Sequence, residues 1–114
     1  MIALTDETYA DDILAAAGGE SILAVVIGEM GWTHYGNDER HAPGLARKGE
    51  VLTWFEAKPL LSYSYDDGYG APDCQAVVAW TENRVITTET YDGSTSVVWM
   101  HRDPVPHLPE MGGG

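Results

Sequence analysis

Four histidines are the side chains of this sequence best suited to hold a metal ion. His34 and His41 lie in a glycine-rich segment, whereas His101 and His107 lie towards the C-terminal end. Zinc needs three or four ligands in fixed geometry, usually including a closely spaced pair on a rigid element. The sequence contains no HxH, HExxH or CxxC spacing. A small metal-dependent hydrolase that uses His34, His41 and His101 with neighbouring carboxylates is therefore only the alternative hypothesis.

Cys74 is the single cysteine of the chain. It cannot form an internal disulfide, which excludes a disulfide-stapled secreted scaffold and a Cys-based zinc finger. A catalytic thiol would need a histidine beside it, and a lone cysteine at the start of a strand is more commonly a small core residue. The sequence also lacks GxSxG, P-loop and dinucleotide-binding glycine patterns. We therefore predict no catalytic residue, no metal and no cofactor.

Carboxylates dominate the charge, with 18 Asp and Glu against 6 Lys and Arg and a formal net charge of −12. This balance argues against direct binding to nucleic acid or to an anionic membrane surface. Acidic clusters on one face could imitate nucleic-acid phosphates and attract a basic groove on another protein. The alternative is that a solvated acidic surface keeps a small protein soluble. The clusters are Asp6, Glu7, Asp11 and Asp12; Asp66, Asp67 and Asp73; and Glu82, Glu89 and Asp92.

Aromatic residues with a polar tip are frequent, with 4 Trp and 6 Tyr against 1 Phe. Binding interfaces favour such residues because they combine apolar area with a hydrogen-bonding group. Core packing is expected for at least one of Trp80 and Trp99, whereas two loops, at 31–45 and 65–73, present other aromatic residues. We expect the binding residues to be Trp32, Tyr35, Asp38 and Glu39 from the first loop and Asp66, Asp67, Tyr69 and Asp73 from the second.

The length of 114 residues fits one domain whose core is large enough to be stable without metals or disulfides. We expect a single domain over 1–104 and an extended or disordered tail over 105–114. No segment approaches the ~18–20 apolar residues that a membrane-spanning helix needs. The acidic start lacks the basic region of a secretory signal. These observations favour a cytoplasmic location.

The first quarter of the sequence predicts a helix followed by a strand. Thr5 is the expected N-cap, with Asp6 and Glu7 in the first turn and Gly18-Gly19 as the stop. The continuous apolar run 21–29 is compatible with a buried strand or a buried helix. Its shortness and its β-branched residues favour the strand.

The middle of the sequence predicts a second short helix and a second strand. Thr53 and Glu56 form a capping box that opens a helix through about Leu61. Pro59 requires this helix to be short or to begin late. Apolar or aromatic residues then alternate with serines over 61–65, which is typical of a half-buried strand.

The last third predicts an antiparallel meander over 75–81, 84–91 and 95–102. Glu82-Asn83 is short enough for a tight hairpin, and Asp92-Gly93 is suited to a primed turn. The predicted fold class is α+β: an antiparallel sheet of four to five strands with one or two short helices packed on one face.

Several stretches resemble a set of small accessory proteins encoded by actinobacteriophages, including phages of mycobacteria. The stretches are GESILAVVIGEMGW, DERHAPGL, LTWFEAKPLLSYSYDDGYGAPDC, and VAWTENRVI followed by YDGST, which together span roughly 11–104. No activity and no binding residue are known to us for that group. The resemblance implies a viral accessory protein that acts in a bacterial cytoplasm on a host protein rather than on a metabolite.

The leading hypothesis is a non-enzymatic protein that binds and modulates a host protein with a basic surface. The acidic surface would steer the encounter and the two loops would supply aromatic anchors. Mimicry of nucleic-acid charge is a sharper form of this hypothesis. The chain is expected to be a monomer or a homodimer. A third hypothesis for its function is a structural protein that self-assembles through an exposed edge strand.

Overall fold

The fold combines one antiparallel sheet with short helices. The computed structural model describes residues 8–31, 39–65, 73–91 and 94–109. Four strands follow one another in the sheet in chain order. The α+β class and the C-terminal meander are thus confirmed, with one more short helix in the described residues than expected. The elements are α1 (Tyr9–Ala16), β1 (Ala24–Met30), α2 (Ala42–Leu45), α3 (Trp54–Leu61), β2 (Gln75–Trp80), β3 (Arg84–Tyr91) and β4 (Ser94–His101).

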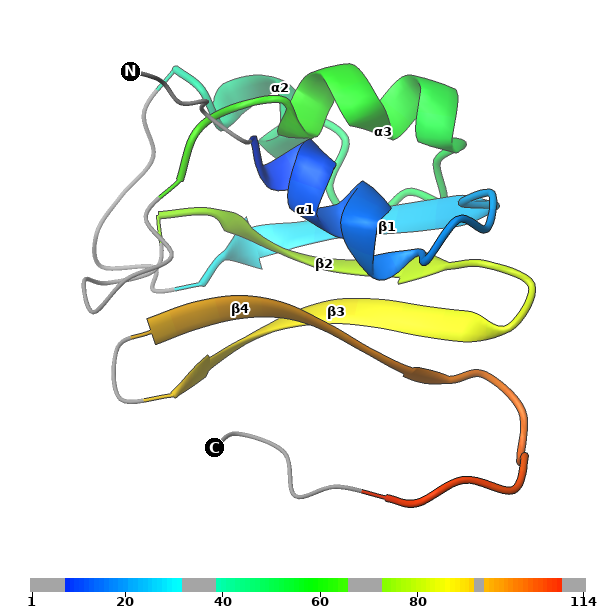
Figure 1. The fold of residues 1–114 in the computed structure, drawn as a ribbon. Coiled ribbons are helices and arrows are strands. Elements are labelled where there is room, and N and C mark those ends of the chain that lie inside the picture. The colour runs from blue at the N-terminus through cyan, green and yellow to red at the C-terminus, as the bar shows by residue number, and fades with distance from the viewer. Residues whose placement is uncertain (1–7, 32–38, 66–72, 92–93, 110–114) are drawn as a thin grey trace, which may run out of the picture.

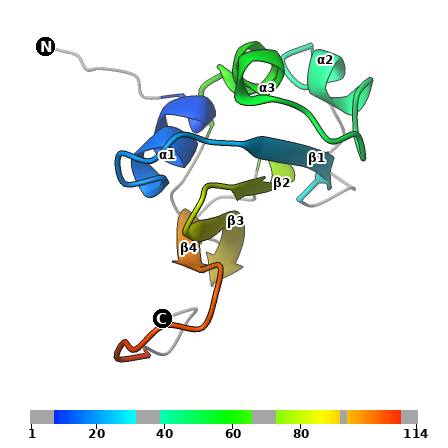
Figure 2. The ribbon, with the colours of Figure 1, turned by 90° about the vertical axis from the view of Figure 1, so that its right-hand side faces the viewer.

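The helices gather on one face of the sheet, here called the inner face (Figures 1 and 2). α1 lies against β3 and β4, whereas α2 and α3 lie against β1. The side chains of alternate strand residues enter this layer and form one core with the buried faces of α1 and α3. The core comprises Tyr9, Ala10, Ile13, Ala17, Ile22, Val25, Ile27, Leu52, Ala57, Leu61, Tyr63, Cys74, Val77, Ala79 and Ile86.

The N-cap of α1 is Thr8, not Thr5. The Thr8 hydroxyl accepts a hydrogen bond from the Asp11 amide at 3.2 Å, and the Asp11 carboxylate accepts one from the Thr8 amide at 3.0 Å. This reciprocal pair satisfies two amides that a helix start leaves without partners, and the backbone bond lowers the pKa of Asp11. Thr5, Asp6 and Glu7 lie outside the described residues.

The end of α1 depends on two glycines and one arginine. Gly18 and Gly19 have φ angles of +63° and +89°, a region that side chains with a Cβ rarely adopt. The Arg84 guanidinium donates to the Ala16 carbonyl at 2.8 Å and stacks 3.6 Å from the centre of the Trp99 ring. A Cβ on Gly18 would overlap this guanidinium, whereas one on Gly19 would meet nothing.

The apolar run after α1 forms a strand, as predicted. β1 is an edge strand of the sheet. Its free edge is covered by the segment that leads to α3. Val25 and Leu52 exchange two backbone hydrogen bonds of 2.8–2.9 Å, and the Gly49 amide donates to the Ile27 carbonyl. α3 follows directly, with the predicted capping box between Thr53 and Glu56. It is only eight residues long and carries Pro59 in its second half.

The predicted strand over 61–65 is wrong. Leu61 is the last residue of α3, and no strand contains residues 62–65. The alternation was nevertheless informative, because Leu61 and Tyr63 are buried whereas Ser62 and Ser64 are exposed. The backbone of this segment binds other groups instead of a neighbouring strand. The Tyr63 carbonyl accepts from the Tyr9 amide and the Ser64 carbonyl from an arginine side chain.

The other face of the sheet, here called the outer face, carries no described helix, and two of its rows are largely apolar. One row across it is Val26, Val78, Thr87 and Val98, and a second row is Ala24, Trp80, Val85 and Met100. The expectation that Trp80 or Trp99 belongs to the core is wrong. Trp80 is half-buried in an outer-face row, and Trp99 is 41% exposed beside Arg84.

We predict that Gly18→Ala lowers the free energy of unfolding by about 1 kcal/mol more than Gly19→Ala. Both variants strain a positive φ, but only the first displaces the Arg84 guanidinium. Urea unfolding of the two variants measures the difference, and the same pair in an Arg84→Ala background is the control. A difference that persists without Arg84 would contradict the explanation.

Candidate functional site

Both predicted binding loops leave the sheet at the same end, here called the loop end. β1 finishes there at Met30 and β2 begins there at Gln75, since the two strands are antiparallel and these residues pair. Of the predicted binding residues, Glu39 is exposed and Asp73 is half-buried. The other six, Trp32, Tyr35, Asp38, Asp66, Asp67 and Tyr69, lie outside the described residues.

The first loop is shorter than the predicted 31–45, because α2 occupies 42–45 and the loop ends at His41. Arg40 connects this end of the first loop to both ends of the second. One guanidinium nitrogen donates to the Ser64 carbonyl at 2.7 Å, and another lies 3.4 Å from the Asp73 carboxylate. The guanidinium also lies over the Tyr63 ring, 5.9 Å from its centre. An arginine can make these contacts together because its planar head offers several donors and a face for stacking.

His41 makes a second connection between the loops. Its Nε2 lies 2.6 Å from the Asp73 carbonyl oxygen, and its ring meets the Tyr63 ring edge-to-face at 5.0 Å. The side chain is only 2% exposed. It is therefore part of the packing at the loop end, not a ligand presented to solvent.

Gln75, which sequence reasoning did not select, is the centre of this arrangement. Its side-chain amide donates to the His41 carbonyl at 2.9 Å and its side-chain oxygen accepts from the Tyr63 hydroxyl. Its backbone amide donates to the same hydroxyl at 3.2 Å, and its backbone carbonyl accepts from the Tyr9 hydroxyl at 2.8 Å. The residue is fully buried, so each bond replaces one that water would otherwise make. We call Tyr9, His41, Tyr63 and Gln75 the Gln75 network.

Room for the Gln75 side chain comes from Gly44 in α2. A Cβ at this position would lie 2.6 Å from the amide nitrogen of Gln75. α2 is thus held against the sheet at a distance that only glycine allows.

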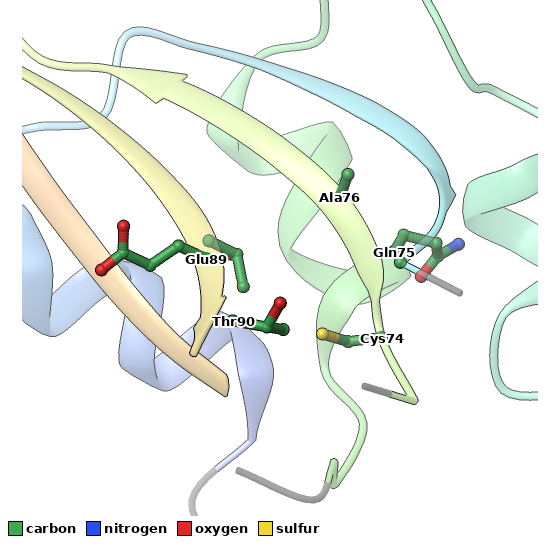
Figure 3. A pocket seen from close by; sticks show the side chains of 7 residues that line it. Cys74, Gln75, Ala76, Glu89 and Thr90 are labelled. Carbon is green, nitrogen blue, oxygen red and sulfur yellow. The ribbon is translucent and has the colours of Figure 1, made fainter. Parts of the chain in front are cut away.

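A small cleft opens on the other side of Gln75, where β2 and β3 separate (Figure 3). The paired register of these strands ends at Val78 and Thr87. Beyond it the Tyr9 hydroxyl bridges the gap, 2.8 Å from the Gln75 carbonyl and 2.6 Å from the Thr88 hydroxyl. The cleft has a volume of about 220 Å³ and is lined by Gly31, Cys74, Gln75, Ala76, Thr88, Glu89 and Thr90.

The cleft is smaller than most small-molecule sites, which enclose roughly 300–1,000 Å³. A volume of about 220 Å³ fits one side chain of a partner or a few waters. Figure 3 shows that the Glu89 carboxylate extends away from Cys74 and Thr90. Because Glu89 is among the lining residues, the cleft suits a short polar or apolar group better than an anion.

The Cys74 thiol is not set up as a nucleophile. The side chain is buried, and desolvation raises its pKa to about 12. Burial also raises the pKa of the neighbouring Tyr9 and Tyr63 hydroxyls. Since the thiolate is the reactive form, Cys74 at neutral pH acts as the small core residue that the sequence suggested.

The histidines of the hydrolase hypothesis do not converge within the described residues. His41 lies at the loop end, whereas His101 is the last residue of β4 and pairs with Arg84 at the opposite end of the sheet. His101 there contacts the rings of Trp99 and His107, with centres 5.2 Å and 4.6 Å away. No group of three potential metal ligands occurs in residues 8–31, 39–65, 73–91 and 94–109. His34 lies outside these ranges.

The cations of the chain are largely used inside the molecule. All 6 Lys and Arg lie in described segments. Lys58 apart, each donates to a carboxylate or to a backbone carbonyl. The pairs are Arg40 with Asp73, Arg47 with Glu50 and Glu56, Lys48 with Glu29, Arg84 with the Ala16 carbonyl, and Arg102 with the Thr81 carbonyl.

Comparison with known protein families, with curated proteins and with solved structures finds no match for this chain. No described helix is long and apolar enough to cross a membrane. The arguments about function therefore rest on the residues and their geometry.

We predict that Tyr63→Phe lowers the free energy of unfolding by about 2 kcal/mol, because it removes a bond partner from two buried groups of Gln75. Tyr65→Phe is the matched control. Its hydroxyl binds the carboxylate of Asp12, which is only half-buried and keeps access to water. Its loss should cost less than that of the Tyr63 hydroxyl, because water can replace it at the half-buried carboxylate. Equal losses in denaturant unfolding would contradict the role assigned to the network.

We also predict that Cys74 of the folded protein stays unreactive towards a thiol reagent from pH 7 to pH 9, and reacts at once after unfolding in urea. The folded pKa of about 12 lies above the ordinary 9.0. The raised pKa therefore contributes fully to the free energy of unfolding below pH 9, where the thiol is protonated in both states. This contribution is lost as the pH rises from 9 towards 12. Labelling of the native protein at the rate of an exposed cysteine would contradict the assigned burial.

Proposed function

We propose that this chain is a non-enzymatic accessory protein, of actinobacteriophage origin, that binds and modulates a host protein through its loop end. The observation that carries the proposal is the coupling of the two loops. Arg40 and His41, at the end of the first loop, bind Asp73, at the end of the second. The described residues that flank 32–38 and 66–72 are therefore held together, and we infer that the aromatic and acidic residues of both loops act on one partner.

A fixed base matters because binding through loops costs entropy. Each flexible side chain or loop that orders at an interface reduces the affinity. The Gln75 network holds the ends of both loops on buried, fully hydrogen-bonded groups. These described loop ends would then lose little conformational entropy when a partner binds, and the cleft beside Gln75 could receive one side chain of that partner.

Charge favours a partner with a basic surface. The chain has a formal net charge of −12, and nearly every described cation already binds an internal acceptor, so few cations are left to contact an acidic partner. The sequence of the two loops adds Asp38, Asp66 and Asp67 near the proposed surface. Such a field accelerates encounter with a basic protein. Competition with nucleic acid for that protein, in the bacterial cytoplasm, is the sharper form of the proposal.

The test places a photo-crosslinking phenylalanine derivative at Tyr35 or at Tyr69 and exposes each protein to a lysate of an actinobacterial host. Phe55 is the matched control position, because it is aromatic, 91% exposed and at the start of α3, near the end of the sheet opposite to the loops. We expect one adduct of the same mass from both loop positions and none from position 55. Adducts of equal yield from all three positions, or none from either loop, would refute the proposal.

The electrostatic part has its own test. Adduct yield from the Tyr69 position should fall at least about tenfold between 50 mM and 500 mM salt, because screening removes the steering. Asp66→Asn with Asp67→Asn should lower the yield at low salt, whereas Glu82→Gln, an exposed position outside the loops, should leave it unchanged. Binding that is independent of salt would contradict recognition by charge.

A further inference from the structure

The free edge of β4 is an independent candidate interface. β4 is the last strand of the sheet, and only β3 pairs with it. The opposite edge, on β1, is covered by the Gly49–Leu52 segment through three backbone hydrogen bonds. In Figure 2 α1 lies above β4, on the inner face, and the segment that follows β4 turns away below the sheet. A long open edge is the feature of a sheet that most readily pairs with another chain.

The pairing of β4 with β3 identifies the outward backbone groups. The Arg102 amide donates to the Asn83 carbonyl at 2.9 Å. Because the direction of backbone groups alternates along a strand, the even-numbered residues of β4 bind β3 and the odd-numbered ones point outward. The outward amides and carbonyls therefore belong to Thr95, Val97, Trp99 and His101. In the part of the chain that the structure describes, they form no backbone hydrogen bond.

β4 lacks the devices that usually protect an edge. Its sequence, STSVVWMH, contains no proline, no lysine and no carboxylate. The pairing with β3 is also regular over all eight residues, without a bulge that would twist the edge away. Because β4 itself carries no carboxylate, two copies can pair along this strand without repulsion between its own side chains, although the chain has a net charge of −12.

We propose that two copies of this chain pair through antiparallel β4 strands and form one continuous eight-stranded sheet. A two-fold axis at Val98 brings all four outward residues of each strand into hydrogen-bonded pairs. Val97 then faces Trp99 of the second copy, and Thr95 faces His101 of the second copy. In a register centred on Val97, His101 has no partner within β4 of the second copy, and in one centred on Trp99, Thr95 has none. The positions of the outward residues therefore favour the register centred on Val98.

The side chains support the same register. Val98 of one copy lies opposite Val98 of the second copy. This is a non-hydrogen-bonded pair, in which the Cα atoms are about 4.5 Å apart and the side chains are closest. On the outer face the row Val26, Val78, Thr87 and Val98 then continues into the same row of the second copy. The two loop ends point in opposite directions, so the pair would present two binding surfaces. The proposal does not depend on the function proposed for the loops.

The experiment measures the mass in solution of the full chain over a range of concentrations by sedimentation equilibrium. The wild type should approach twice the 12.4 kDa of one chain as concentration rises. Val98→Lys and Val98→Glu should each weaken the pairing at least about tenfold, because like charges meet across the axis. An equimolar mixture of the two variants should restore the double mass, because opposite charges now meet.

Val51→Lys is the matched control. Val51 is 75% exposed and lies beside Val26, at the far end of the same outer-face row, so its replacement should leave the mass unchanged. Circular dichroism of each variant tests folding, and the mixture provides a second check because misfolded variants would not rescue one another. A wild type that stays at 12.4 kDa at all concentrations overturns the proposal. Equal loss of pairing in Val51→Lys, or no recovery in the mixture, also overturns it.

Discussion

The burial of the Gln75 amide is the constraint on which the loop end depends. A fully buried amide that lacks partners costs about 1–3 kcal/mol for each group left unsatisfied. Gln75 avoids this cost by binding Tyr63 and, through the His41 carbonyl, the segment that leads into α2. Its backbone carbonyl adds the Tyr9 hydroxyl from α1. Three separate parts of the chain are thus fixed to the first residue of β2.

The same constraint explains why the sheet opens at this end. The Tyr9 hydroxyl occupies the space between β2 and β3, where it binds the Gln75 carbonyl and the Thr88 hydroxyl. The strands therefore cannot close into a regular ladder beyond Val78 and Thr87. The cleft is a consequence of the anchoring of α1, and it lies beside the bases of both loops.

Local rules predicted much of the fold. The three strand-like runs of the last third correctly indicated β2, β3 and β4, although the predicted Asp92-Gly93 turn lies outside the described residues, and the Thr53–Glu56 capping box correctly indicated α3. The N-cap of α1 was also available, since Thr8 is followed three residues later by Asp11 whereas Thr5 is followed by no such acid. The strand over 61–65 was wrong because alternation reports burial, and here Tyr63 is buried by a hydrogen-bond network and not by a neighbouring strand.

The candidate site was harder to predict because its organising residues have no local signature. Nothing around Gln75 distinguishes it from an ordinary polar residue at a strand end, and its partners lie as far away in sequence as Tyr9. Arg40 likewise reaches Asp73, a contact that only the tertiary fold creates. The sequence predicted binding residues in both loops, which stays a prediction, and the structure adds that the described ends of the loops share one base.

Native-state hydrogen exchange at the backbone amide of Gln75 tests the central claim most directly. The Gln75 amide donates to a buried tyrosine hydroxyl, so it should exchange only with global unfolding, as should the core amides of Val25 and Leu52. Exchange of Gln75 as fast as the amide of Val51, a residue that is 75% exposed, while Val25 and Leu52 stay protected, would show that the loop end opens by itself. That result would contradict a common rigid base for the two loops.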